Sequence, residues 1–235
     1  MSDLILETHA LTKRYQSLGA PALADVDLTV RKGRIVGLLG PNGSGKTTLI
    51  KMIAGLLTPT SGELLIDGKA PDTETKAIVS YLPDHNFLTG WMTVEETINY
   101  HADFFADFRR DRALDMTARL GLDLRQKTKT LSKGNQEKLE LILCMSRDAK
   151  LYLLDEPIAG VDPATRDYII ETILSNYSEN STVLISTHLI ADVEPALEDV
   201  IFLRGGEVLL QSTVDDIREQ HGMSVDGYFR EVFKW

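Results

Sequence analysis

Hydrophobic residues follow two different patterns along the chain. Nearly continuous apolar runs are typical of strands that are buried on both faces of a parallel sheet. Four segments have this pattern, the last of them only in part: Ile35–Leu39, Leu151–Leu154, Val183–Ser186 and Ala77–Leu82. Alternating apolar and polar residues instead predict antiparallel strands, which we expect at Leu4–Thr8, Leu23–Val30 and Glu63–Ile66. Together the two patterns predict an α/β protein with an antiparallel β layer beside a parallel core.

The middle of the chain has a helical pattern. No strand signal occurs from Val94 to about Arg147, and turn breaks are expected at Gly121 and near Lys133-Gly134. We interpret the segment of about 85–150 as a helical subdomain that is inserted in the core.

The last third of the chain adds a hairpin. Val200–Leu203 and Val208–Gln211 flank a glycine turn, which predicts two paired strands. The 235 residues are within the usual size of one α/β unit. We therefore expect a single domain over residues 1–235.

A glycine-rich loop follows the first continuous apolar run. Gly40-Pro41-Asn42-Gly43-Ser44-Gly45-Lys46-Thr47 has the G-x-x-x-x-G-K-[ST] spacing and leads into a helix expected at about Lys46–Gly55. In such a loop the backbone N–H groups surround the β-phosphate, the lysine reaches the β- and γ-phosphates, and the hydroxyl of Thr47 can ligate Mg²⁺. The helix N-terminus favours the same anion. We assign these residues to a nucleoside triphosphate site: Gly40, Asn42, Gly43, Gly45, Lys46, Thr47 and Thr48.

Two carboxylates follow a second apolar run. Asp155 and Glu156 end the segment Leu151-Tyr152-Leu153-Leu154-Asp155-Glu156. Acidic surface residues seldom follow four apolar ones. A phosphate loop needs a carboxylate on the metal side, which we assign to Asp155, and a group that polarises the attacking water, which we assign to Glu156.

A second phosphate-binding surface is expected between these motifs. Leu131-Ser132-Lys133-Gly134-Asn135-Gln136-Glu137-Lys138 opens an apolar-periodic helix that runs through Met145. The Ser132 hydroxyl, the Gly134 N–H and the helix N-terminus can bind phosphate together, although the segment alone is equally typical of a helix cap. Because it follows a phosphate loop and precedes Asp155-Glu156, it resembles the signature motif of the ATP-binding cassette (ABC) family.

The resemblance extends over nearly the whole chain and implies a P-loop NTPase (RecA-like) core. Tyr15 resembles the aromatic residue that stacks on adenine, Asp162 in Ala159-Gly160-Val161-Asp162 is placed as in the D-loop, and His188 as the switch histidine. In this family two cassettes associate head to tail around ATP. The resemblance thus implies an ATPase with Glu156, His188 and Lys46 as catalytic residues, whose ATP also meets Ser132 and Gly134 of the partner.

The chain departs from the family pattern at three positions. Asp84, in Tyr81-Leu82-Pro83-Asp84, stands where the family usually has a glutamine that touches Mg²⁺ and the attacking water. A carboxylate there can bind Mg²⁺ more directly and repels the γ-phosphate without metal. We therefore place Asp84 with Thr47 and Asp155 as metal ligands and expect a stronger metal requirement. Lys133 and Asn135 replace a glycine and a glutamine of the signature.

Charge and hydropathy bear on the partners. The 25 Lys and Arg residues against 35 Asp and Glu residues give a net charge of −10, which argues against a surface that coats nucleic acid. No apolar run approaches the roughly 18 residues that span a bilayer. With the resemblance, this implies a cytoplasmic ATPase that is peripheral on the cytoplasmic face of the cell membrane and powers a separate integral membrane permease. A homodimer and a heterodimer with a second ABC subunit are both open.

Two segments suggest how such a subunit works. The tail 224–233 is similar to the short ending of export-type, bacterial-like single-cassette subunits, and this favours export. The loop His85–Met92 carries aromatic residues, and we hypothesise that it lines the groove that receives a permease helix. The alternative, that Phe87 and Trp91 only pack against the helical subdomain, is equally open.

Sequence features also bear on the alternatives to a transporter ATPase. The main alternative is a soluble, non-transport ABC ATPase that acts on ribosomes or DNA. The stretch between Lys46 and Ser132 is too short for the long coiled coils of DNA-repair members, and translation-associated members usually contain two cassettes. A GTPase lacks support because no Asn-Lys-x-Asp motif occurs, and the signature before Asp155-Glu156 argues against a small-molecule kinase.

Overall fold

The computed structural model describes residues 3–16, 19–159, 161–176 and 181–234. Within these ranges, six strands form a sheet in the order β5-β6-β7-β3-β8-β9. All neighbours are parallel except β8 and β9. The strands are β3 (Ile35–Leu39), β5 (Val79–Leu82), β6 (Leu151–Asp155), β7 (Thr182–Thr187), β8 (Asp199–Arg204) and β9 (Glu207–Thr213). Every residue of β3, β6 and β7 is buried, as expected for strands covered on both faces.

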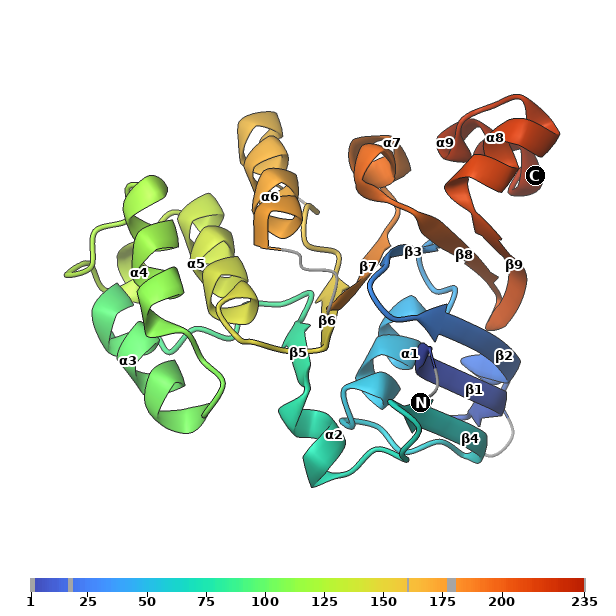
Figure 1. Cartoon of the computed structure of the whole chain (residues 1–235), viewed down its shortest axis with the longest axis horizontal. Helices are drawn as coiled ribbons and strands as arrows, with labels where there is room; N and C mark the ends of the chain where they lie inside the picture. Colours follow the sequence, from blue (N-terminus) through green and yellow to red (C-terminus); the bar gives the residue numbers. More distant parts are fainter. Residues whose placement is uncertain (1–2, 17–18, 160, 177–180, 235) are drawn as a thin grey trace.

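A smaller antiparallel sheet lies beside this core (Figure 1). Its order is β2-β1-β4, with β1 (Leu4–Lys13), β2 (Leu23–Arg31) and β4 (Ser61–Ile66). Helix α1 (Lys46–Ile53) packs between the two sheets, because its Leu49 and Met52 share one buried cluster with Ile5 of β1 and Leu38 of β3. The predicted antiparallel β layer is therefore confirmed.

The helical segment is inserted between β5 and β6, which are neighbours in the sheet. It contains α3 (Val94–Phe104), α4 (Arg110–Arg119), the short helix η1 (Thr128–Thr130) and α5 (Lys133–Met145). Figure 1 shows α3, α4 and α5 together at one end of the molecule, far from the three-stranded sheet. The inserted helical segment is thus confirmed, whereas its bounds of about 85–150 and the single domain over 1–235 stay predictions.

The other helices follow the later strands. They are α6 (Pro163–Asn176), α7 (Ile190–Val193), η2 (Glu194–Ala196), α8 (Val214–His221) and α9 (Val225–Val232), and α2 (Thr73–Ala77) precedes β5. In Figure 1, α8 and α9 lie beside β8 and β9. In the described ranges, no helix is long and apolar enough to cross a membrane.

Two sequence predictions were wrong in detail. The strand expected from Ala77 begins only at Val79, because Asp72 caps a short helix that ends at Ala77. The turn expected near Lys133-Gly134 is the first turn of α5, because the side chain of Ser132 accepts a hydrogen bond from the N–H of Asn135 and caps the helix there.

Candidate active site

The glycine-rich loop joins β3 to α1 and surrounds a hollow. Gly43 and Gly45 have φ angles of 80° and 108°, a region that glycine adopts readily. A Cβ atom on Gly45 would lie 2.6 Å from the carbonyl oxygen of Ala22, so only glycine fits. The hollow, which we call the P-loop hollow, is lined by Ala22, Asn42, Gly43, Ser44, Gly45, Lys46, Thr47, Thr48, Asp84 and Glu156.

Lys46 lines this hollow and is fixed by contacts of its ammonium group. Only 6% of its surface is exposed, and its Nζ donates to the carbonyl oxygen of Gly40 at 2.8 Å. The same ammonium lies 3.5 Å from Glu156 Oε1. A buried cation in a glycine-rich loop of this kind can bind a phosphate.

Asp155 ends β6 opposite Ser186 of β7. Its Oδ1 accepts hydrogen bonds from the Ser186 hydroxyl and from Thr47 Oγ1, the latter at 3.3 Å. Its Oδ2 is buried and has no hydrogen-bond partner among the described residues. Burial raises the pKa of this carboxyl, and the two hydrogen bonds oppose the effect.

An unpartnered carboxylate oxygen beside a hydroxyl fits a hard cation. Mg²⁺ prefers oxygen ligands and is usually bound by one or two carboxylates together with substrate phosphates. The arrangement of Asp155 and Thr47 therefore fits the expected metal. Asp84 lines the P-loop hollow, as Thr47 does. Its half-exposed carboxylate accepts a hydrogen bond from His85 Nδ1 at 3.1 Å when that ring nitrogen carries the proton.

Glu156 lies at the centre of the site. Its backbone φ is 52°, a left-handed conformation that costs energy for a residue with a Cβ. The N–H of Glu156 donates to both the carbonyl and the hydroxyl oxygen of Ser186, at 3.0 and 3.2 Å. Its carboxylate lies between Lys46 and His188, whose Nδ1 is 3.0 Å from Oε2. The three residues expected to be catalytic are thus brought together.

Tyr15 lies near the start of α1. Its hydroxyl is 3.3 Å from the Thr48 hydroxyl, and 61% of the residue is exposed. The ammonium of Lys13 lies 5.6 Å from the ring centroid. An exposed ring beside the P-loop helix is free to stack on a flat ligand such as a base.

Other predicted site residues lie elsewhere. Among the described residues, Ser132, Gly134 and Asp162 are not part of the lining of the P-loop hollow. Ser132 and Gly134 lie at the exposed N-terminus of α5, and Asp162 accepts hydrogen bonds from the backbone N–H and the hydroxyl of Thr165 at 3.1 and 2.7 Å. The ammonium of Lys133 points toward Glu137 at 3.7 Å. Gly160 of the expected D-loop lies outside the described residues.

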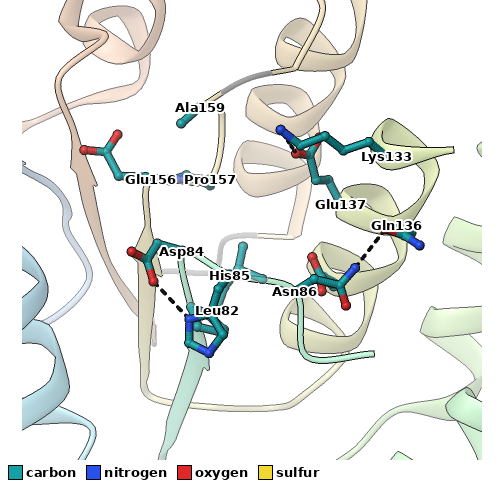
Figure 2. Close-up of a pocket in the computed structure, with 12 residues that line it drawn as sticks. Leu82, Asp84, His85, Asn86, Lys133, Gln136, Glu137, Glu156, Pro157 and Ala159 are labelled. Carbon is teal, nitrogen blue, oxygen red and sulfur yellow. Dashed lines mark hydrogen bonds and ion pairs between the residues drawn. The ribbon is translucent and has the colours of Figure 1, made fainter. Parts of the chain in front are cut away.

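A second hollow separates the loop after β5 from α5 (Figure 2). Asp84, His85 and Asn86 line one side, and Lys133, Gln136 and Glu137 line the other. Asp84 and Glu156 line this hollow as well as the P-loop hollow. The loop after β5 therefore lies between the P-loop hollow and α5, the helix that begins within the signature motif.

An apolar groove lies on the other side of the same loop. It is lined by Ser80, Tyr81, Pro83, Phe87, His101, Phe105, Leu143, Cys144 and Arg147. Phe87 lines this groove, whereas Trp91 is not among its lining residues and is 66% exposed. Phe87 also contacts His101 of α3, as the alternative expects for this residue, but the exposure of Trp91 disagrees with that alternative. A permease helix in this groove stays a prediction.

The sequence reasoning did not assign roles to Ser186, Gln136 or Glu140. Ser186 precedes His188 by two residues at the end of an apolar run. Adjacent parallel strands end at the same edge of a sheet. The sequence therefore contained enough information to predict that Ser186 lies near Asp155. For Gln136 and Glu140, whose partners are in the loop after β5, the sequence carries no comparable signal.

Comparisons with known proteins agree with this geometry. The family model described as "ABC transporter" matches residues 23–159. An uncharacterized ABC transporter ATP-binding protein of Bacillus subtilis, YdbJ, is 38% identical over 88% of this chain and 69% of its own length. The probable multidrug ABC transporter ATP-binding protein YbhF of Escherichia coli is 34% identical over 90% of this chain, which spans only 38% of that relative.

Solved structures agree with the fold. The structure described as the ATP-binding subunit of an ABC transporter superimposes with a TM-score of 0.87 at 29% identity, covering 98% of this chain and all of the other. The dimeric bacterial ABC transporter cassette MJ0796 has a TM-score of 0.77 at 26% identity over 88% of this chain and 98% of its own. Both fold and motifs therefore identify the chain as a member of the ATP-binding cassette family of ABC transporter ATPases.

Proposed function

We propose that this chain is the ATP-hydrolysing subunit of an ABC transporter, that it dimerises around ATP, and that it powers a separate membrane permease in the direction of export. The observation that carries the proposal is the Glu156 carboxylate, which lies between Lys46 and His188 in the P-loop hollow. This arrangement supports hydrolysis rather than binding alone.

The residues present fit ATP and Mg²⁺. Lys46, the loop N–H groups and Thr48 would hold the phosphates, and Tyr15 would stack on the adenine. Thr47, Asp155 and Asp84 would hold the metal, with the unpartnered Oδ2 of Asp155 as its best ligand. When bound, Mg²⁺ would neutralise negative charge that develops on the phosphate oxygens.

The proposed hydrolytic step uses three side chains. Glu156 takes a proton from the attacking water as general base. His188 holds the Glu156 carboxylate through its Nδ1 and so fixes the direction in which the base points. Lys46 stabilises the negative charge that grows on the phosphate oxygens. The two hydrogen bonds from the Glu156 N–H to Ser186 fix the backbone of the base.

A dimer would complete the site. Ser132, Gly134 and Asp162 are exposed or half-buried and do not line the described hollow of their own chain, so they are available to a partner's ATP. The cassette MJ0796 has been solved as a dimer, also in a state bound to ADP and Pi. A homodimer and a heterodimer both fit this proposal, because one chain contains all the elements.

A permease helix is the proposed occupant of the apolar groove beside Phe87. The CbiO1 cassette, which superimposes on this chain with a TM-score of 0.77, is part of the complex CbiONQ. The proposed location is the cytoplasmic face of the cell membrane. Export is proposed from the tail of residues 224–233, which is similar to the short ending of export-type subunits.

The experiment that tests hydrolysis compares Glu156→Gln with wild type. We expect the variant to bind ATP and to lose at least about a hundredfold in turnover, as for removal of a general base. ATP binding is measured by equilibrium titration and turnover by phosphate release. Glu219→Gln, a change of an exposed acid on α8, is the matched control and should keep both. Retained turnover in Glu156→Gln would refute the assigned base.

A further inference from the structure

The loop after β5 is joined to α5 by two hydrogen bonds. Asn86 Nδ2 donates to Gln136 Oε1 at 2.9 Å, as Figure 2 shows. The backbone N–H of Phe87 donates to Glu140 Oε1, also at 2.9 Å. Gln136 is itself held, because its Nε2 donates to the carbonyl oxygen of Thr128 at 3.1 Å. We call these bonds the loop–helix contact.

Glu140 is an unusual residue for its place. It is only 5% exposed, between the buried residues Leu139 and Leu141. A buried carboxylate is costly unless it is hydrogen-bonded or paired. An apolar side chain would fill the same space without that cost, so packing alone does not account for an acid here. Its hydrogen-bond partner is the main-chain N–H of Phe87, so the bond depends on the position of the loop backbone and not on the side chain at position 87.

The loop–helix contact lies between three functional parts of the chain. Asp84 lines the P-loop hollow, Phe87 lines the apolar groove, and α5 begins next to Ser132. We propose that Glu140 is a positioning residue that holds the loop of residues 84–88 against α5, so that Asp84, Phe87 and the N-terminus of α5 keep a fixed relation. The consequence for ATP turnover rests on the proposed function, whereas the contact itself does not.

Charge makes the contact sensitive to pH. Burial is the main reason why the pKa of Glu140 rises to about 7; the nearby Glu137 adds to the rise, while the Phe87 N–H and His85 oppose it. The other charged groups around the hollow are Lys133 on α5, Asp84 on the loop and Glu156 after β6, and His101 of α3 packs against Phe87. Hydrogen bonds to a charged acceptor are stronger than those to a neutral one. While Glu140 stays buried, its ionised carboxylate therefore holds the Phe87 N–H more firmly above pH 7 than its neutral form does below it. The stability of the whole fold changes in the opposite direction, because unfolding exposes Glu140 to water.

Hydrogen exchange at the Phe87 amide tests the contact directly. The protection factor of this amide, corrected for the intrinsic exchange rate, is measured by NMR between pH 6 and 8 in the full chain. We expect it to rise with pH in wild type and to stay constant in Glu140→Gln, which keeps a neutral acceptor. Glu140→Leu should lower it by about tenfold at pH 8, the equivalent of one lost hydrogen bond.

Two further variants separate Glu140 from its charged neighbours. Glu137→Gln removes a like charge and should move the transition in wild type to lower pH. His85→Asn removes the histidine of the loop and should leave a transition in place. Equal protection in wild type and Glu140→Leu would overturn the proposal, as would a transition that persists in Glu140→Gln.

Turnover measurements test the functional consequence. We expect Glu140→Leu to lower kcat by about tenfold with little change in the KM for ATP, because the P-loop is untouched, and Glu140→Gln to recover most of the loss. If the chain hydrolyses no ATP, the proposed function fails, but the Phe87 amide still tests the contact. If turnover is normal in wild type and Glu140→Leu alike, the positioning role fails while the proposed function stands.

Discussion

The P-loop hollow and the loop–helix contact differ in what holds their residues in place. Asp155 and Glu156 lie at the end of β6, and His188 directly follows the neighbouring strand β7. Lys46 begins α1, after the loop that follows β3, the other neighbour of β7. The contact instead joins a loop to a helix through side-chain hydrogen bonds. The first arrangement is fixed by the sheet, whereas the second can be changed by a single proton or a single substitution.

The difference suggests a division of labour. Groups that act on phosphate need fixed geometry, and the ends of buried strands provide it. A segment that responds to a partner needs a few bonds that can be made and broken at modest cost. Variants in the two regions should therefore have different consequences.

The largest effect is expected on stability at the loop–helix contact. The ordinary pKa of Glu140 is 4.5 and its pKa in the folded chain is about 7. The folded state therefore binds more protons between these values, so wild type loses stability as the pH rises through this window. Between pH 4.5 and pH 8, the free energy of unfolding of wild type should therefore fall by about 3 kcal/mol more than that of Glu140→Gln. Urea unfolding at both pH values checks this, and parallel stability profiles would contradict it.

The next largest effect is expected on ATP turnover, from a change beside Asp155 and Glu156. Ser186→Ala removes the donor to Asp155 and one acceptor for the Glu156 N–H. A hydrogen bond to a charged group contributes about 2 kcal/mol, so kcat should fall about 30-fold. Ser186→Thr keeps the hydroxyl and serves as control in the same phosphate-release assay. An unchanged kcat in Ser186→Ala would show that the backbone alone orients Glu156.

A smaller effect is expected at the edge of the site. Tyr15→Ala removes the exposed ring and should weaken ATP binding by about tenfold, the lower range for stacking on a base. Tyr15→Phe keeps the ring but loses the contact with Thr48, and it should bind ATP nearly as wild type does. Equilibrium titration with ATP distinguishes the two. Equal loss in both variants would assign the effect to the hydroxyl instead.

The smallest effect concerns Asp84, which belongs to both regions. Its carboxylate repels the γ-phosphate when no metal intervenes. As Mg²⁺ is withdrawn, the ATPase activity of wild type should therefore fall more steeply than that of Asp84→Gln, by about threefold for a half-exposed charge. Indistinguishable Mg²⁺ curves would remove the hypothesis of a stronger metal requirement.

Sequence patterns predicted the residues around the P-loop hollow better than they predicted the loop–helix contact. Ile35–Leu39 was predicted as a strand with the bounds of β3, because a run buried on both faces has no other stable environment. The motifs that contain Lys46, Glu156 and His188 predicted a cluster that the structure brings together. Strand register explains why these distant residues meet.

The errors arose where local capping or tertiary contact decides the structure. Asp72 extends helix over Ala77, and Ser132 starts α5 earlier than the glycine suggested. Glu140 is the polar residue in the apolar stretch Leu139–Met145 of α5. No sequence pattern indicates that the backbone N–H of Phe87 contacts it. Such pairs depend on how a loop folds back, which periodicity does not encode.

We propose that ATP hydrolysis by this chain powers a separate permease. The most direct test traps the ATP-bound state with Glu156→Gln in the native cell, solubilises the membranes in mild detergent, and identifies the proteins that co-purify by mass spectrometry. We expect a stoichiometric multi-span membrane protein. Ribosomal or DNA-bound partners without any membrane protein would contradict it and assign the chain to the non-transport ABC ATPases.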